Sequence, residues 1–304
     1  MSEYPIGVFD SGVGGLTVLK ALEAELPQER FVYLGDTARL PYGTKSPETV
    51  ARYAVQASEA LLEYGVKCLV IACNTASSVG LPAIRQRIVG MPVIGVIEPG
   101  AKAACATSKS GHIAVIATEG TVRGGAYQEA ILGLRAGARV IAQPTQLFVA
   151  LAEEGLHEGP IAENVARHYL EPLFEVVRCE AGADEPASRP DTLVLGCTHF
   201  PMLVRAIRAA VGPHVNIVDS AATTARSVRE LLDREGLTRR ESSGVREAGW
   251  TEKSHPAPGA CGPRRADGPG ARFLATDSVE RFARIGSRFL ARPIHPDQVE
   301  LVDL

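Results

Sequence analysis

The chain has 304 residues, of which 45% are hydrophobic and 22% are charged, and its formal net charge is −3. These values are typical of a globular protein, and the length exceeds the 100–150 residues or so of one common domain. A slightly acidic chain with 5% aromatic residues argues against a nucleic-acid binder, which needs a basic surface and stacking side chains. With no signal peptide visible and no apolar run of about 18 residues, we expect a cytoplasmic protein that does not enter a membrane and keeps its thiols free.

Segments typical of strands and helices alternate along the chain. The expected strands are Ile6–Asp10, Phe31–Gly35, Cys68–Cys73, Val93–Val96, Ile113–Thr118, Val140–Gln143, Thr192–Cys197, Val215–Asp219 and Phe273–Thr276. The helical patterns between them include Leu16–Leu26, Pro47–Tyr64, Ile161–Val177, Ala221–Glu235 and Ser278–Ala291. Such alternation predicts parallel sheets with helices on both faces.

The two halves of the chain repeat one layout. Residues 7–36 resemble 114–145 in their order of strand, turn, helix and strand, and residues 68–88 resemble 192–211 more clearly. We therefore predict an α/β fold of two similar domains with mainly parallel sheets and an active site in the cleft between them.

The expected domain limits follow from this repeat. The first domain comprises residues 1–97 and 212–304, and the second comprises residues 98–211. Residues 241–271 are rich in glycine and proline and lack apolar periodicity. Such a composition buries too little apolar surface to compensate for the entropy lost on ordering, so we predict a flexible surface insertion there.

Cys73 and Cys197 each end a short apolar run and are followed by small polar residues and a helical pattern. Ligands of α/β sheets bind beyond the carboxyl ends of strands, so both thiols are placed where chemistry occurs. Two similar groups on two similar units favour a reaction that is symmetric about its substrate. The alternatives are small buried side chains, a zinc site that uses Cys197 and His199, and a Cys–His nucleophile. The zinc site lacks a partner Cys-x-x-Cys pair, and the nucleophile leaves Cys73 without a role.

Asp10-Ser11-Gly12-Val13-Gly14-Gly15 follows the first strand and opens a helix. The segment fails the dinucleotide fingerprint because Thr17 stands where the third glycine belongs. Its glycines still allow backbone N–H groups to approach an anion, such as a carboxylate, at the helix N-terminus. The alternative is a tight turn without a ligand. Asp10 itself is either a proton acceptor beside a thiol or a helix cap.

Several further polar residues are candidates for substrate contacts. Thr118, Thr121 and Glu153 are expected at strand ends of the second unit, with Glu154 as the competitor of Glu153. Tyr42 and Gly43, in the loop after the second strand, offer a hydroxyl and an amide. His199 is expected to orient or protonate Cys197, although a lone histidine is often structural.

In these residues the chain resembles the glutamate racemases of the cofactor-independent aspartate/glutamate racemase superfamily, over nearly everything outside Glu241–Ala271. The motifs that carry the resemblance are Asp10-Ser11-Gly12-x-Gly14-Gly15, Asp36-Thr37, Pro41-Tyr42-Gly43, Cys73-Asn74-Thr75, Glu153-Glu154-Gly155 and Gly196-Cys197-Thr198-His199-Phe200-Pro201. The resemblance implies interconversion of L- and D-glutamate without pyridoxal phosphate or metal, in the bacterial cytoplasm, to supply D-glutamate for peptidoglycan. It also implies a homodimer. One departure is Gly124, where the family usually has serine.

The resemblance also implies roles for individual residues. Cys73 is then the base for one enantiomer and Cys197 the base for the other, with Asp10 and His199 assisting. Substrate is held by Asp10, Ser11, Tyr42, Gly43, Asn74, Thr75, Thr118, Thr121, Glu153, Thr198 and His199. One cysteine must be a thiolate while the other is a thiol, and we expect Asp10 or His199 to bring the pKa of the pair toward neutrality. An aspartate racemase, a Cys–His hydrolase or lyase, and an amino-acid binding module remain the alternatives.

Overall fold

The structure is a computed structural model that describes residues 2–174, 189–239 and 270–304. The strands are β1 (Ile6–Asp10), β2 (Arg30–Gly35), β3 (Cys68–Ile71), β4 (Val93–Gly95), β5 (His112–Ala117), β6 (Arg139–Pro144), β7 (Thr192–Gly196), β8 (Asn216–Asp219), β9 (Gly270–Ala275) and β10 (Val299–Leu301). The α-helices are α1 (Leu16–Glu25), α2 (Pro47–Leu62), α3 (Asn74–Val79), α4 (Leu81–Arg87), α5 (Ile97–Thr107), α6 (Glu119–Gly124), α7 (Ala126–Leu134), α8 (Leu147–Glu154), α9 (Pro160–Phe174), α10 (Val204–Val211), α11 (Ser220–Arg234) and α12 (Val279–Leu290).

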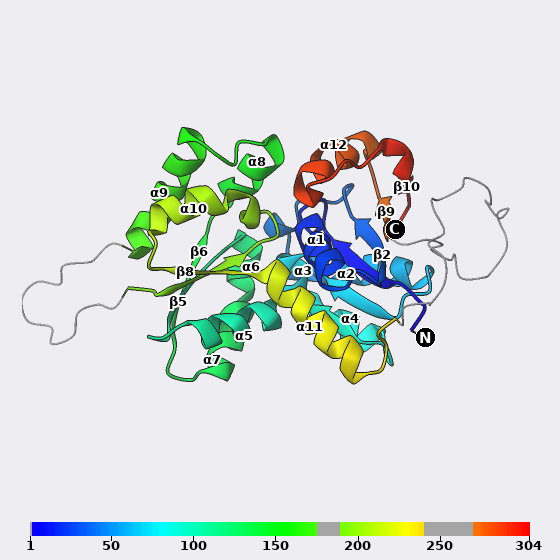
Figure 1. The fold of residues 1–304 in the computed structure, drawn as a ribbon, viewed down its shortest axis with the longest axis horizontal. Helices are drawn as coiled ribbons and strands as arrows, with labels where there is room; N and C mark the ends of the chain where they lie inside the picture. The colour runs from blue at the N-terminus through cyan, green and yellow to red at the C-terminus, as the bar shows by residue number, and fades with distance from the viewer. Residues whose placement is uncertain (1, 175–188, 240–269) are drawn as a thin grey trace, which may run out of the picture.

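The strands form two parallel sheets, one in each of two lobes (Figure 1). The first sheet has the order β10-β9-β2-β1-β3-β4, and the second has the order β6-β5-β7-β8. The segment β2-β1-β3-β4 therefore repeats as β6-β5-β7-β8. The predicted fold class is confirmed, and the strand order shows the repeat in three dimensions.

The chain passes between the lobes at two places. After β4, α5 leads to β5 of the second sheet, and after β8, α11 packs along α1 of the first lobe (Figure 1). The sequence placed residues 212–304 with the first lobe, but Asn216–Asp219 pair with β7 in the second sheet. An apolar run ending in aspartate suits either sheet, because the pairing partner is not encoded locally. The return crossing thus lies after β8, and the exact domain limits remain a proposal.

The predicted insertion at residues 241–271 falls mostly outside the described residues. Its last two residues, Gly270 and Ala271, begin β9 and pair with Arg30 and Phe31 of β2. The prediction for these two residues is wrong because pairing with a neighbouring strand extends β9 beyond its apolar part. The short strand β10 was not expected from the sequence.

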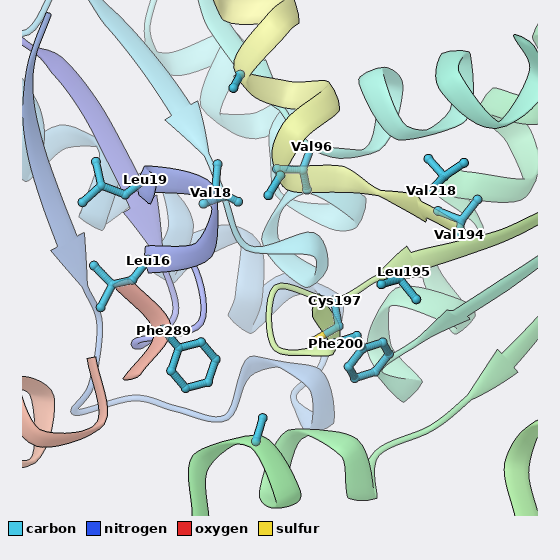
Figure 2. Close-up of a cluster of buried hydrophobic side chains, with 14 of the residues drawn as sticks. Leu16, Val18, Leu19, Val96, Val194, Leu195, Cys197, Phe200, Val218 and Phe289 are labelled. Atoms are coloured by element: carbon cyan, nitrogen blue, oxygen red, sulfur yellow. The ribbon is translucent and has the colours of Figure 1, made fainter. Parts of the chain in front are cut away.

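Alternate residues of the first sheet face two different cores, as the two-residue period of a strand requires. Phe31 and Tyr33 face one cluster, whereas Val32 and Leu34 face the other. The larger cluster continues into the second lobe. Figure 2 shows Leu16, Val18 and Leu19 of α1 on one side of it and Val194, Leu195 and Val218 of the second sheet on the other. The lobes are therefore joined by a continuous apolar core.

Candidate active site

The carboxyl ends of four strands supply the chemical groups of the site. Asp10 ends β1 and Cys73 follows β3 in the first lobe, while Thr118 follows β5 and Cys197 follows β7 in the second. Because β1 and β3 occupy the positions that β5 and β7 occupy in the other sheet, the two cysteines are structurally equivalent. The structure brings them close enough for the charge of Cys197 to act on Cys73.

Asp10 is 1% exposed and does not cap α1. The backbone N–H of Gly12 donates to its Oδ2 atom at 2.9 Å. Its Oδ1 atom is buried and has no hydrogen-bond partner among the residues that the structure describes. Burial raises the pKa of Asp10, against the opposing charge of His199 and the N–H groups of Gly15 and Gly12. The carboxyl group thus keeps one oxygen available for a ligand.

Cys73 is the N-cap of α3, and its Sγ atom accepts a hydrogen bond from the Ala76 N–H at 3.4 Å. The thiol donates to the Oγ atom of Ser11, also at 3.4 Å. Burial, followed by the charge of Asp10, raises the pKa of Cys73 to about 12. Asp10 therefore does not bring the pKa of Cys73 toward neutrality, because like charges disfavour the thiolate. Cys73 is a thiol at neutral pH in this state.

Cys197 has a different environment, built around His199. The Nδ1 atom of His199 lies 3.7 Å from the Sγ atom of Cys197, and its Nε2 atom lies 3.2 Å from Oε1 of Glu153. Burial lowers the pKa of His199, but Cys197 and Glu153 outweigh it and raise the pKa to about 10. His199 is therefore an imidazolium at neutral pH, which is the partner that stabilises a thiolate.

Glu153 was expected at a strand end but lies near the end of helix α8. Its side chain is 17% exposed, and its Oε2 atom accepts a hydrogen bond from Arg281 of α12 at 2.9 Å. Burial raises the pKa of Glu153, yet the bonds from His199 and Arg281 outweigh it and lower the pKa. The neighbouring Glu154 is exposed, so the structure favours Glu153 of the two candidates.

Three threonines meet across the junction of the lobes. The hydroxyl of Thr75 in α3 lies 3.0 Å from that of Thr118 and 3.2 Å from that of Thr121, which are 3.0 Å apart. Beside them, the hydroxyl of Tyr127 in α7 donates to the Oδ1 atom of Asn74 at 2.8 Å. The Nδ2 atom of Asn74 is buried and has no hydrogen-bond partner among the described residues. The cluster presents hydroxyl and amide donors of the kind that bind a carboxylate.

Tyr42 and Gly43 contribute differently from the expectation. The hydroxyl of Tyr42 donates to Oδ2 of Asp36 at 2.5 Å, within the first lobe, so it is already engaged. Burial and the adjacent Asp36 raise the pKa of Tyr42 well above its ordinary value. Gly43 faces the second lobe, where an added Cβ atom would lie 2.9 Å from that of Thr118. Of this pair, Gly43 reaches the junction and the hydroxyl of Tyr42 does not.

Small residues let the lobes approach closely. A Cβ atom on Gly14 would lie 2.3 Å from Oγ1 of Thr198 and 2.5 Å from the ring of His199. The hydroxyl of Thr17 donates to the carbonyl of Thr198 at 3.0 Å. A Cβ atom on Gly124 would lie 2.3 Å from Oγ of Ser78 in α3. The departure at Gly124 therefore falls at a close contact, where any side chain displaces its neighbour.

The site is closed in this structure. Cys73 is 5% exposed and Cys197 is 6% exposed, and Thr198 is 4% exposed. A groove of about 1000 Å³ lies elsewhere, between β4, α5 and α11, and none of the candidate site residues lines it. Substrate entry therefore requires a more open state of the site.

Residues 2–174, 189–239 and 270–304 contain no group of three histidine, cysteine or acidic side chains that could hold a metal ion. In the same ranges, no helix has both the length and the apolar character needed to cross a membrane. Cys68, Cys73, Cys105 and Cys197 are free thiols.

The sequence profile of the Asp/Glu/Hydantoin racemase family matches residues 6–228. The chain belongs to this family. It is 45% identical over 285 residues to the glutamate racemase of Geobacter metallireducens, which covers 94% of this chain and 92% of that protein. It is 44% identical to the glutamate racemase of Koribacter versatilis, over 98% of this chain and 97% of that protein. The resemblance inferred from the motifs is confirmed.

Solved structures agree with this assignment. The crystal structure of glutamate racemase from Francisella tularensis in complex with D-glutamate matches with a TM-score of 0.80 at 31% identity, covering 100% of this chain and 98% of that chain. Glutamate racemase from Thermus thermophilus, in complex with beta-chloro-D-alanine, matches with a TM-score of 0.77 at 40% identity, covering 100% of this chain and 98% of that chain. This racemase therefore shares the two-lobed α/β fold of these enzymes.

Sequence reasoning missed three contributors to the site. Tyr127 orients Asn74, Arg281 binds Glu153, and the ring of Phe289 meets the ring of His199 edge-on, with centroids 5.1 Å apart. Arg281 and Phe289 lie in α12, more than 80 residues after Cys197 along the chain. No local motif marks them, because their role arises only from the packing of α12 against the second lobe.

Proposed function

We propose that this protein interconverts L- and D-glutamate by proton transfer at the α-carbon between two thiols, Cys73 and Cys197. The observation that carries the proposal is the equivalent placement of the two cysteines beyond the carboxyl ends of β3 and β7 in the repeated lobes. Racemisation removes a proton from one face of the α-carbon and returns one to the opposite face. Two groups that face each other accomplish this without moving around the carbon.

The environments of the two thiols define a starting state. Cys197 beside the imidazolium of His199 is the base, and Cys73, whose pKa is raised to about 12, is the acid. Cys197 takes the α-proton of one enantiomer while the Cys73 thiol gives its proton to the other face. The reverse reaction starts from the Cys73 thiolate and the Cys197 thiol. Asp10 and Ser11 border Cys73, and His199 borders Cys197, so each thiol has its own polar partner.

The polar groups of glutamate are complementary to the unpaired atoms of the site. The free Oδ1 atom of Asp10 is an acceptor for the α-ammonium group, and the free Nδ2 atom of Asn74 is a donor for a carboxylate. Thr75, Thr118 and Thr121 supply further hydroxyl donors, and Thr198 and Gly43 complete the lining of the proposed substrate site. Glutamate has two carboxylates, and we assign one to Asn74 and the other to the three threonines.

Fixed donors are essential to the rate. Enzymes lower barriers by roughly 8–23 kcal/mol, whereas one acid–base pair contributes only about 10²–10⁴-fold, or about 3–5 kcal/mol. The remainder must come from donors on the carboxylate that stabilise the charge developing at the α-carbon, inside a closed site. The buried threonine and asparagine groups supply this environment.

Alanine variants of the two cysteines test the proposal. Cys73→Ala and Cys197→Ala are expected to bind glutamate and to lose racemisation, as followed by polarimetry. Cys105→Ala, which changes a thiol outside the site, is the matched control and keeps full activity. Substantial turnover by either site variant contradicts the proposal. Faster turnover of L-aspartate than of L-glutamate favours an aspartate racemase, and hydrolysis or elimination without α-proton exchange favours a Cys–His hydrolase or lyase.

The proposal extends to the cellular role implied by the resemblance. The enzyme works in the cytoplasm without pyridoxal phosphate or metal, supplies D-glutamate for peptidoglycan and forms a homodimer. Sedimentation equilibrium measures the oligomeric state, and a monomer at micromolar concentration contradicts the dimer. Racemisation that persists after exhaustive dialysis against a chelator supports the metal-free part, and its loss contradicts that part.

A further inference from the structure

Helix α12 connects β9 to β10 of the first sheet, yet it lies beside α8 of the second lobe (Figure 1). Arg281, Arg288 and Phe289 are spaced by seven and eight residues, which places them on one face of a helix. Arg281 donates to the carboxylate of Glu153, and Arg288 donates to the carbonyl of Glu153 at 3.1 Å. Phe289 packs edge-on against the ring of His199.

These contacts form a chain that ends at Cys197. Arg281 Nη2 lies 2.9 Å from Oε2 of Glu153, and the other oxygen of Glu153 lies 3.2 Å from Nε2 of His199. The opposite ring nitrogen of His199 lies 3.7 Å from Sγ of Cys197. Each oxygen of Glu153 therefore has one partner, and together the two partners fix the plane of the carboxylate.

Arg281 constrains the orientation of the Glu153 carboxylate by binding its Oε2 atom. Rotation of a carboxylate about its terminal bond is soft, so a single bond to His199 leaves the orientation of the group open. The bond from Arg281 to the second oxygen removes this freedom, and the Arg288 contact fixes the backbone of the same residue. The orientation of His199 depends in turn on Glu153, which holds the Nε2 atom of the ring. Cys197 and Thr198 lie at the Nδ1 atom, and Phe289 and Gly14 pack against the ring.

An ordinary surface ion pair is the competing interpretation. Arg281 is half-exposed, and exposed pairs typically contribute about 0–1 kcal/mol to stability. A purely structural pair changes the stability of the protein and leaves the balance between the two proton transfers unaltered. A pair that positions His199 acts on one proton transfer only, namely the one at Cys197.

We propose that Arg281 is a positioning residue for the reaction, which holds Glu153 from the opposite lobe so that His199 is aligned on Cys197. The inference rests on the proposed two-thiol racemisation. It makes α12 a part of the active site through its contacts with Glu153 and His199. The base at Cys197 is then fully assembled only when the two lobes are together.

Isotope effects test the inference. We compare Arg281→Gln with Arg284→Gln, a matched change at an exposed arginine on the same helix, using L- and D-glutamate deuterated at the α-carbon. Arg281→Gln is expected to lower kcat/KM about tenfold. The deuterium effect on kcat/KM rises for the enantiomer that Cys197 deprotonates, because that step becomes more rate-limiting, and it falls for the other enantiomer. Arg284→Gln leaves both effects unchanged.

Two further variants complete the design. Arg281→Lys keeps the charge and restores part of the loss, and Arg281→Gln has no additional effect when Glu153→Gln is already present, as a double-mutant cycle requires for coupled residues. Equal isotope effects in Arg281→Gln and wild type, or additive losses in the cycle, overturn the inference. If the wild-type protein does not racemise glutamate, the proposed function fails instead, so the two failures are distinguishable.

Discussion

The Nδ1 atom of His199 lies 3.7 Å from the Sγ atom of Cys197, and the opposite nitrogen of the same ring lies 3.2 Å from Glu153. The equivalent thiol, Cys73, contacts Ser11 and lies near Asp10 instead. The two halves of the site therefore have equivalent backbones and different electrostatics. This asymmetry keeps Cys73 a thiol at neutral pH and places an imidazolium beside Cys197.

Replacement of His199 by glutamine removes the imidazolium beside Cys197. We expect His199→Gln to lower the turnover number by about 10²–10⁴-fold, the usual contribution of a general acid–base group. Steady-state polarimetry with both enantiomers checks this. Glutamate binding, measured by calorimetry, is the control for folding of the site. Turnover within a factor of three of wild type contradicts the role of His199.

The stability of the protein depends on the charge of His199. The folded-state pKa of about 10 lies above the ordinary histidine value of about 6.5. The protonated ring therefore stabilises the fold fully below pH 6.5, and this contribution is lost as the pH rises to about 10. Urea unfolding of wild type and His199→Gln should show a difference in unfolding free energy that shrinks between pH 6.5 and pH 10. A difference that is constant over this range contradicts the prediction.

Replacement of Asp10 by asparagine removes an acceptor without changing the shape of the site. The buried Oδ1 atom has no partner among the described residues, so we assign it to the ammonium group of the substrate. We expect Asp10→Asn to weaken glutamate binding by about 1.5–3 kcal/mol, the value of a hydrogen bond to a charged group. Calorimetric titration measures this loss. Unchanged affinity would show that Asp10 only stabilises the loop through its hydrogen bond from Gly12.

Gly14 tests the close approach of the lobes. In Gly14→Ala the new methyl group meets Thr198 and the ring of His199 at 2.3–2.5 Å. We expect a loss of about 1–3 kcal/mol in unfolding free energy, typical of overpacking, and a lower turnover number because His199 is displaced. Gly133→Ala is the matched control, since Gly133 lies in α7 with nothing within 4 Å of its added Cβ atom. That change should stabilise the protein by roughly 0.5–1 kcal/mol. Equal behaviour of the two variants rules out a close interlobe contact.

The sequence predicted the parts of the site that follow strand ends. Cys73 and Cys197 end apolar runs and are followed by polar residues, so a local pattern was enough to find them. The structure was needed for Arg281 and Phe289, whose helical pattern is that of any amphipathic helix. It was also needed for Tyr42, because the sequence does not show that its hydroxyl binds Asp36.

The strand assignments show the same division between local and distant information. The β1 strand matches its predicted limits because its apolar residues and its final aspartate lie together in the chain. The membership of β8 in the second sheet and the early start of β9 depend on pairing with β7 and β2. The pKa of Cys73 likewise follows from burial by residues distant in sequence, which composition alone does not reveal.

The central claim is that the thiols on opposite faces of the α-carbon exchange different protons. Racemisation of L-glutamate in D₂O, stopped at early turnover and analysed by mass spectrometry after separation of the enantiomers, tests it most directly. With two opposed thiols, newly formed D-glutamate carries deuterium at the α-carbon while the remaining L-glutamate carries almost none. D-glutamate that retains the original α-hydrogen, or L-glutamate that gains deuterium as fast as D-glutamate appears, would show a single shuttling base and rule out the two-thiol mechanism.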